Sequence, residues 1–250
     1  MRMTLTALPG IPLVKPGDDL AGLILEAAAR ADLAFESGDL LVVAQKVVSK
    51  AEGRHVDLTQ ITPSAEALEI AGRAEKDPRL VEVILSEAKQ VLRIRPGVII
   101  VEHRLGFVCA NAGVDHSNVG GGEVVLMLPL DPERSAARLR DALQQASGAR
   151  LGVLIIDSLG RAWRMGTEGV AIGLSGLPAL MDLRGWPDLF GDPLLVTQLG
   201  VADEIAAAAS LLMGQAAEGR PVVHLRGMPY PLREGTTQEL LRPKEEDLFR

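Results

Sequence analysis

Aromatic residues are scarce in this chain of 250 residues, at 3% of the total. The core must therefore be built from aliphatic side chains, within a hydrophobic content of 47%. Positive charge is also in short supply, because 26 Lys and Arg stand against 33 Asp and Glu and no basic run occurs. The net charge of −7 argues against nucleic acid as a partner, since affinity for the phosphate backbone depends on clustered Lys and Arg.

Cysteine occurs once, at Cys109, which excludes an intrachain disulfide and is typical of a reducing cytoplasm. Cys109 lies in an apolar run with no paired histidine in the adjacent sequence, so we expect a buried structural thiol rather than a nucleophile. No hydrophobic run approaches the roughly 18 residues of a membrane span, and residues 1–9 contain no signal-peptide core. We therefore expect a soluble, cytoplasmic protein with no membrane partner.

The chain is long enough to bury a large core, as one domain over residues 1–250 or as two interlocked lobes. Apolar residues at helical spacing, together with capping residues, predict helices at 18–35, 64–74, 78–91, 131–146 and 203–214. Short β-branched runs bounded by turn residues predict strands at 38–44, 98–101, 106–112, 124–128, 152–156, 194–199 and 221–225. From residue 98 to residue 128 the strands follow one another, with 106–112 as the hairpin partner of 98–101. This succession favours an α+β fold with mixed or antiparallel sheets and flanking helices over a doubly wound parallel sheet.

Two apolar runs each place an aspartate at their end, where small and polar residues take over. Asp115 is followed by Ser117, Asn118 and three glycines, and Asp157 is followed by Ser158. Carboxylate and hydroxyl oxygens are ligands for a hard cation such as Mg²⁺, and glycines let the backbone approach phosphate oxygens. Either aspartate alone is as typical of a turn that caps a helix. The occurrence of two favours a metal and phosphate site.

Basic side chains follow two of the predicted strands. Lys46 and Lys50 are four residues apart, with Ser49 between them, and would share one face of a helix. They are candidates for holding phosphate, the alternative being a solvated surface turn. Arg161 and Arg164 follow the second aspartate and could clamp a phosphoryl group during transfer. The alternative for these arginines is surface ion pairing, which is worth about 0–1 kcal/mol per pair.

Several signatures of other protein classes are absent. The chain has no Walker motif and no dinucleotide fingerprint, and glycines 120–122 lack the Lys and Ser/Thr of a phosphate loop. No Gly-x-Ser-x-Gly elbow supports a serine hydrolase. The histidines show no ligand spacing, which argues against a zinc site; they are His55, His103, His116 and His224. A bound nucleotide would therefore be held by some other arrangement.

Taken together, these segments resemble the coenzyme F420-0:L-glutamate ligase family, also called F420:γ-glutamyl ligase. The matching stretches span nearly the whole chain in order, at 8–12, 15–18, 45–53, 94–102, 106–118, 157–164 and 201–214. The resemblance implies an α+β fold peculiar to the family and an intertwined homodimer. Some members carry a further C-terminal, flavin-binding, nitroreductase-like domain, for which 250 residues leave no room.

The resemblance also implies a reaction. L-Glutamate is joined through its amine to the terminal carboxylate of coenzyme F420-0, and further glutamates are added through γ-linkages. GTP is the energy source and GDP the product, with Mg²⁺ or Mn²⁺ at two sites and K⁺ as a further cation. The acceptor carboxylate first takes the γ-phosphoryl group of GTP to become an acyl phosphate, which the glutamate amine then attacks. Such a reaction needs no protein nucleophile, in agreement with the absence of a convincing one.

Residue by residue, Asp115 resembles a metal-binding aspartate, and Asp157 with Ser158 matches a metal-binding pair expected to read Asp-Thr. Serine retains the hydroxyl ligand. Asn118 corresponds to a nucleotide contact, and Gln215 to a ligand of the second metal. The nucleotide site is expected to be completed by Gly10, Ile11, Pro12, Leu13, Gln45, Lys46, Ser49, Lys50, Met213 and Gly214. Arg161 and Arg164 are the catalytic candidates.

Two other classes of function stay open at this point. Another metal-dependent phosphotransferase, or an ATP-grasp-like ligase for a different acid, would use the same aspartates. A non-catalytic nucleotide-binding module would bind GTP without turnover and would leave Arg161 and Arg164 without a task.

Overall fold

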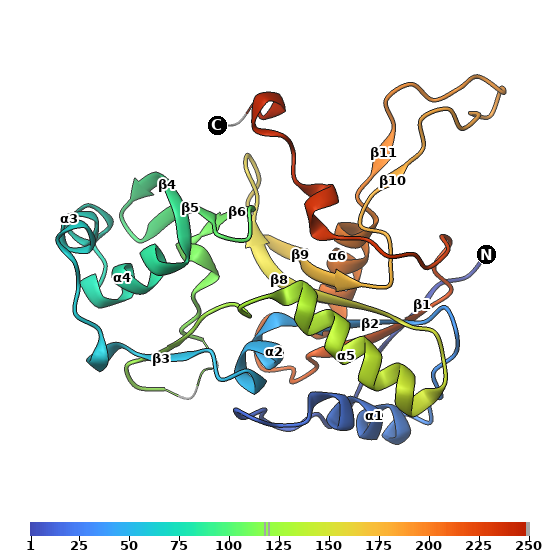
Figure 1. Cartoon of the computed structure of the whole chain (residues 1–250), viewed down its shortest axis with the longest axis horizontal. Helices are drawn as coiled ribbons and strands as arrows, with labels where there is room; N and C mark the ends of the chain where they lie inside the picture. Colours follow the sequence, from blue (N-terminus) through green and yellow to red (C-terminus); the bar gives the residue numbers. More distant parts are fainter. Residues whose placement is uncertain (118, 120, 249–250) are drawn as a thin grey trace.

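The structure, a computed structural model, describes residues 1–117, 119 and 121–248. Its centre is a five-stranded sheet in the order β1–β12–β2–β8–β9 (Figure 1). The strands are β1 (Thr4–Ala7), β2 (Leu40–Ala44), β8 (Gly152–Gly160), β9 (Thr167–Ser175) and β12 (Val222–Arg226). β2 and β8 run parallel, and every other neighbouring pair in this sheet is antiparallel.

Both faces of this sheet are buried, which explains why β2 and β8 are continuous apolar runs. Leu41 and Val43 of β2 pack with α1, α2 and α5 on one face, and Leu40 and Val42 pack with α6 on the other. Each fully buried aliphatic side chain of this kind contributes about 1.5–3 kcal/mol. The helices are α1 (Leu20–Arg30), α2 (Gln45–Ala51), α5 (Pro132–Ser147) and α6 (Val201–Met213).

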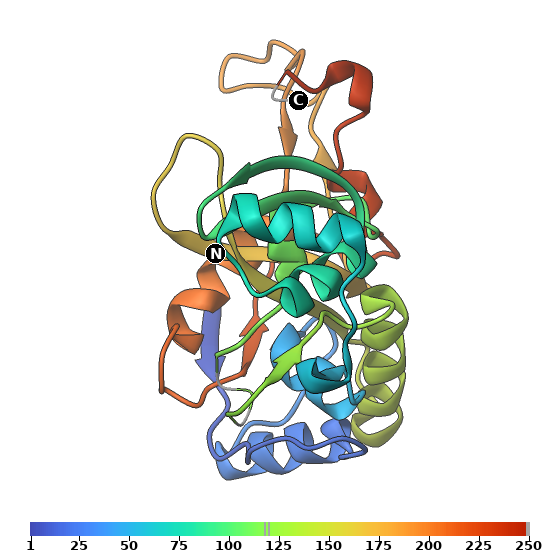
Figure 2. The same cartoon turned by 90° about the vertical axis from the view of Figure 1, so that its left-hand side faces the viewer.

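A smaller lobe, whose apolar core also includes Leu159 of β8, lies at the left of the sheet in Figure 1 and faces the viewer in Figure 2. Its elements are α3 (Ala65–Ala74), α4 (Pro78–Glu87), β4 (Ala88–Arg95), β5 (Val98–His103) and β6 (Val108–Ala110). Two short paired strands, β3 (His55–Asp57) and β7 (Val124–Leu126), lead into and out of it. The buried carboxylate of Glu87 ties this lobe to the connecting segments, since it accepts hydrogen bonds from Arg54 at 3.1 Å and Arg104 at 3.0 Å.

A long hairpin projects from the body of the protein, built on β10 (Met181–Asp182) and β11 (Gln198–Leu199) (Figure 1). Its exposed apolar side chains are Trp186, Leu189, Phe190, Leu195 and Val196. Single 3₁₀ turns complete the structure, at η1 (Leu58–Gln60), η2 (Asn111–Gly113), η3 (Thr237–Leu240) and η4 (Lys244–Glu246). Among the residues that the structure describes, no helix has the length and apolar character to cross a membrane.

The predicted mixture of helices with several, mostly antiparallel sheets is confirmed, including the hairpin of β5 with β6. Several predicted elements differ in extent: the helix predicted over 18–35 ends at Arg30, and the strand predicted over 152–156 continues to Gly160. The helix predicted over 78–91 ends at Glu87, because the chain from Ala88 pairs with β5 and tertiary pairing overrides the helical period. The strand predicted over 194–199 is reduced to β11, because nothing in the described chain covers Leu195 and Val196, which are 78% and 84% exposed.

Candidate functional site

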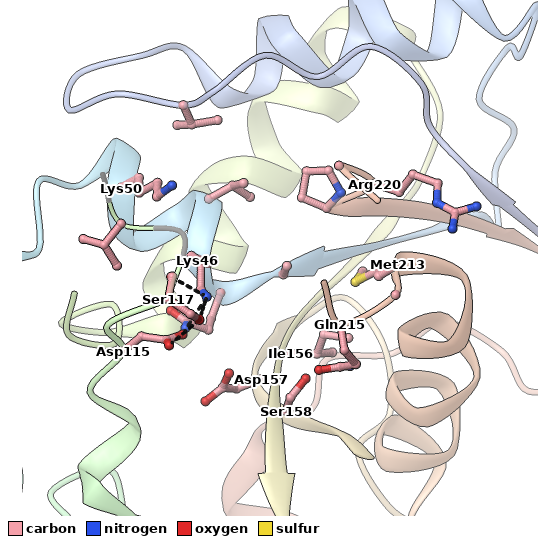
Figure 3. A pocket seen from close by; sticks show the side chains of 18 of the residues that line it. Lys46, Lys50, Asp115, Ser117, Ile156, Asp157, Ser158, Met213, Gln215 and Arg220 are labelled. Atoms are coloured by element: carbon pink, nitrogen blue, oxygen red, sulfur yellow. Dashed lines mark hydrogen bonds and ion pairs between the residues drawn. The ribbon is translucent and has the colours of Figure 1, made fainter. Parts of the chain in front are cut away.

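A cavity of about 1160 Å³ opens where β2 and the parallel part of β8 end (Figure 3). Its walls come from four segments far apart in sequence: the stretch before α1, helix α2, the stretch after β6, and the loop after α6. The residues predicted for the site that line it are Ile11, Pro12, Leu13, Gln45, Lys46, Lys50, Asp115, Asp157, Ser158, Met213, Gly214 and Gln215. The structure thus brings most of the predicted set together.

The parallel register of β2 and β8 sets the geometry of the cavity floor. Ala44, the last residue of β2, lies opposite Ile156 of β8. The residues that follow them, Gln45 and Asp157, are therefore neighbours. The sequence predicted that Asp157 ends its strand. This is wrong, because β9 continues to pair with β8 as far as Gly160. Asp157 lies instead just beyond the end of β2. The carboxyl end of a parallel strand pair is where open α/β sheets bind ligands.

Asp157 lies in an environment that disfavours the negative charge of its carboxylate. Burial raises the pKa of Asp157 to about 6, and the nearby carboxylate of Asp115 adds to this rise. Hydrogen bonds from the Ser158 amide and the Gln45 side chain, together with the charge of Lys46, oppose it. A buried carboxylate with a second carboxylate close by forms a site that a divalent cation would stabilise.

Gln45 and Ser49 form a buried, hydrogen-bonded pair, of which Gln45 lines the cavity. The Ser49 hydroxyl donates to Gln45 Oε1 at 2.9 Å, so the amide nitrogen of Gln45 is left to face Asp157. Ser49 is fully buried and does not line the cavity, unlike the lysines on the same helix. Its position fits the support of Gln45, and through it the orientation of the Asp157 carboxylate.

Lys46 and Asp115 join two segments that are about seventy residues apart. Lys46 Nζ lies 2.8 Å from Asp115 Oδ2 and donates to the carbonyl and hydroxyl oxygens of Ser117 at 3.0 and 3.1 Å. The Ser117 hydroxyl donates in turn to Asp115 Oδ1 at 3.0 Å. Two backbone hydrogen bonds of 2.9 Å to Leu126 fix Asp115 itself. A cation and a carboxylate are therefore held side by side at the cavity wall.

Lys50 lies one turn further along α2, and both lysines line the cavity, as their spacing predicted. Burial lowers the pKa of Lys50, and the positive charge of Lys46 lowers it further. An anionic ligand would reverse both effects, because it would supply the opposing charge that a partly desolvated ammonium needs. The segment is a helix, and its predicted lysine face is a candidate phosphate site.

The oxygen atoms around the cavity floor suit a hard divalent cation. Asp157, Ser158 and Gln215 surround its lower part in Figure 3, with Asp115 facing them. No group of three His, Cys, Asp or Glu side chains that could hold a metal occurs among the described residues. In proteins, Mg²⁺ is held by one or two carboxylates together with waters and substrate phosphates. The donor set fits such a cation.

Four predicted residues do not line the cavity, and one is not described by the structure. Gly10 does not line the cavity, and its carbonyl accepts a hydrogen bond from the Arg30 side chain at 3.0 Å. Arg161 and Arg164 follow the lining residues of β8 but do not line the cavity themselves, and Arg161 forms an ion pair with Glu168. Ser49 is buried as described above, and Asn118 lies outside the described residues.

Arg220 lines the cavity opposite the lysines and was not found from the sequence (Figure 3). The polar residues recognised in the sequence follow predicted strands, whereas Arg220 precedes β12. Because β12 is antiparallel to β2, its beginning lies at the same edge of the sheet as the end of β2, and Ala44 donates to the Pro221 carbonyl at 2.8 Å. Only the pairing direction reveals this position.

Cys109 is buried, as predicted. Burial raises the pKa of its thiol to about 12, and the charge of Asp157 contributes to the shift. A thiolate is the reactive form of cysteine, so this side chain is poorly suited to act as a nucleophile.

Comparison with known proteins gives a consistent result. The model of the F420-0:gamma-glutamyl ligase family matches residues 10–227. A coenzyme F420:L-glutamate ligase of Methanothermobacter thermautotrophicus is 48% identical, over 100% of both chains. Proteins of the same name from Methanopyrus kandleri and Methanocaldococcus jannaschii are 49% and 45% identical, over 95% and 96% of this chain and 93% and 94% of theirs. The resemblance seen in the sequence is confirmed: the chain belongs to the F420-0:gamma-glutamyl ligase family.

Proposed function

We propose that this protein is a GTP- and divalent-metal-dependent ligase. It joins L-glutamate to the terminal carboxylate of coenzyme F420-0 with release of GDP, and then adds γ-linked glutamates. The names of its relatives support the ligation of glutamate to coenzyme F420. The observation that carries the proposal is the pair Asp115 and Asp157, which face one cavity together with Lys46 and Lys50.

In this proposal four oxygen-bearing side chains of the cavity lining would hold Mg²⁺ or Mn²⁺, at two sites. These side chains are Asp115, Asp157, Ser158 and Gln215. When bound, the metal neutralises phosphate charge during phosphoryl transfer. The K⁺ ion implied by the sequence resemblance stays a prediction without an assigned ligand.

Lys46 and Lys50 hold the nucleotide phosphates in this arrangement. Both are point charges on one helix face, and both are close enough to Asp115 to sense its charge. The acceptor carboxylate attacks the γ-phosphorus and becomes an acyl phosphate, GDP leaves, and the glutamate amine displaces phosphate. No protein side chain forms a bond with substrate, in keeping with the inert environment of Cys109.

The cavity has room for more than one substrate. Sites for single drug-sized ligands measure about 300–1000 Å³, and this cavity measures about 1160 Å³. The stretch from Ile11 to Lys15 and the loop from Met213 to Arg220 both line it and would enclose the nucleotide. The remaining volume leaves space for the reacting ends of the acceptor and of glutamate.

The proposal is tested by measuring GDP release with GTP, coenzyme F420-0, L-glutamate and Mn²⁺, omitting each component in turn. A ligase of this kind releases GDP at a sustained rate only when all four are present. For a ligase or phosphotransferase that acts on a different acid, the rate of GDP release would not depend on coenzyme F420-0. A non-catalytic binding module would bind GTP without any release of GDP.

Lys50→Ala is expected to raise the KM for GTP about tenfold, with a smaller effect on the KM for L-glutamate. The reason is that a lysine ammonium acts as a charge on phosphate oxygens and has no comparable partner on the amino acid. Lys46→Ala either raises the KM for GTP in the same way or, if Lys46 faces the acidic part of coenzyme F420-0, mainly raises the KM for that substrate. Separate KM values for the three substrates decide between these roles.

Lys89→Ala is the matched control, because Lys89 is an exposed lysine paired with Glu102 on the smaller lobe. It is expected to leave all three KM values unchanged. If Lys46→Ala and Lys50→Ala also match the wild type, α2 does not hold the phosphates.

We also propose that the protein is a homodimer, as its sequence resemblance implies. The projecting hairpin supports this, because it presents Leu189, Phe190, Leu195 and Val196 to solvent without any covering element in the described chain. A contiguous exposed apolar group of this kind marks an interaction surface. A second copy of the chain would bury it.

Light scattering at micromolar concentration is expected to give twice the single-chain mass of 26.6 kDa. The double substitution Leu189→Asp and Phe190→Asp should shift the protein toward the single-chain mass, because burying two carboxylates would oppose association. A single-chain mass for the wild type would contradict the dimer, and an unaffected dimer in the variant would exclude the hairpin as its contact.

A further inference from the structure

The turn between β8 and β9 stands at the rim of the cavity. Gly160 and Thr167 pair with each other across its base, and both line the cavity. The side chain of Arg161, the first residue after β8, forms an ion pair with Glu168, which lies opposite Leu159 in the strand pair, and so ties the turn back to its base. The six residues 161–166 therefore extend directly from the strand that carries Asp157.

This rim loop, defined as residues 161–166, presents large side chains to solvent. Trp163 is 88% exposed and Met165 is 98% exposed. Trp163 also has a φ of +63°, a left-handed conformation that costs a bulky residue roughly 1–2 kcal/mol. A strained backbone conformation and an exposed indole are both unfavourable for the stability of the fold. Strained residues of this kind cluster at sites that bind ligands.

Arg164 adds a positive charge to the same loop. It is exposed, and it forms no ion pair or hydrogen bond with any residue in the described part of the chain. Indole stacks on planar rings, the thioether of Met165 adapts to ring edges, and guanidinium binds anions and aromatic faces. Together these side chains are suited to a planar, conjugated group that carries negative charge.

We infer that the rim loop is the binding subsite for the body of the acceptor substrate. The inference rests on the proposed function, in which the acceptor carboxylate reacts near Asp157 and the nucleotide phosphates lie against Lys46 and Lys50. From Asp157, β8 runs outward to Gly160 over about 10 Å, at about 3.3 Å per residue. An acceptor that reacts at Asp157 and extends away from the lysines passes along this strand and reaches Trp163.

The first test is fluorescence titration of a Trp186→Phe variant, in which Trp163 is the sole tryptophan. Coenzyme F420-0, added without GTP, is expected to quench the Trp163 emission with saturation, and the Trp163→Phe variant corrects for the absorbance of the ligand. Quenching by GTP but not by the acceptor would overturn the inference, because the loop would then be part of the nucleotide site. The absence of saturable quenching would overturn it as well.

The second test is kinetic. Trp163→Ala is expected to raise the KM for coenzyme F420-0 about tenfold or more, consistent with the loss of one aromatic stacking contact, while the KM for GTP changes less than twofold. Trp163→Phe should recover most of the loss, because it retains a ring. Leu130→Ala, at another exposed apolar side chain, is the control and should match the wild type.

The GDP-release assay of the wild type establishes the proposed function independently, so failure of that function is recognised before any variant is compared. If the wild type is active and Trp163→Ala has an unchanged KM for the acceptor, the rim loop is not the acceptor subsite. If Trp163→Ala dissociates a wild-type dimer, the loop is a contact between two copies of the chain and the inference is likewise overturned.

Discussion

Asp115→Asn and Asp157→Asn are each expected to abolish metal-dependent ligation while leaving the fold intact. Asparagine keeps the size of the side chain and one oxygen acceptor, but it removes the negative charge that holds a divalent cation. The loss should amount to several kcal/mol of transition-state stabilisation, which is a fall in rate of at least about a hundredfold. The two variants should behave alike, because both carboxylates face the same cavity floor.

Ligation rates across a Mn²⁺ titration are the measurement, with circular dichroism to check that each variant is folded. Asp141→Asn is the matched control, since Asp141 is an exposed carboxylate on α5 that lies near Arg140 and away from the cavity. Its rates should equal those of the wild type. Near wild-type rates for either cavity variant at low Mn²⁺ would remove that aspartate from the metal site.

Asp157→Asn is further expected to make the metal-free protein more stable at neutral pH. The pKa of Asp157 is raised to about 6 in the folded protein, against an ordinary value of 3.8. Folding therefore favours the protonated form, so the contribution of this group to stability is present below pH 3.8 and is lost as the pH rises to about 6. Each pKa unit corresponds to 1.36 kcal/mol, so the carboxylate costs roughly 1–3 kcal/mol at pH 7.5.

Thermal unfolding in the presence of a chelator checks this expectation. At pH 7.5 the variant should melt roughly 2–12 °C above the wild type, since 1 kcal/mol shifts the melting temperature of a chain of this size by about 2–4 °C. At pH 4 the difference should largely disappear, because Asp157 is then mostly protonated in the folded wild type. A variant that is less stable than the wild type at pH 7.5 would show that Asp157 stabilises the fold instead.

Added Mn²⁺ should reverse the order of stability. A ligand that binds only the folded state raises its stability by RT ln(1 + [L]/Kd), which is about 2.7 kcal/mol at a hundredfold excess over Kd. The wild type should gain this increment, whereas Asp157→Asn should gain little. Asp141→Asn should follow the wild type both with the chelator and with Mn²⁺.

Local patterns in the sequence were sufficient for several features of this protein. The succession of strands between residues 98 and 128 predicted the hairpin of β5 with β6 and the mixed fold, because strand periodicity and turn residues are local properties. The spacing of Lys46 and Lys50 predicted their common face, since four residues make about one helical turn. The two aspartates were recognised from the polar residues that follow them, and both line the cavity.

Other features depend on pairing between segments that are distant in sequence. Hydrophobic periodicity does not predict which segments pair. The adjacency of Gln45 and Asp157 follows from the register of two parallel strands, and the place of Arg220 follows from the antiparallel direction of β12. Local propensity also failed at Ala88, where pairing with β5 ends a helix that the spacing would continue.

The sequence by itself determined which side chains could hold metal and phosphate, because residue type and local spacing can be read directly from it. The tertiary structure decided which of them share a cavity. It buried Ser49 against Gln45, set Lys46 beside Asp115, and left Trp163 exposed at the cavity rim. The physical reason is that burial and electrostatic environment, including the raised pKa of Asp157, arise only when strands and loops distant in sequence enclose the same space.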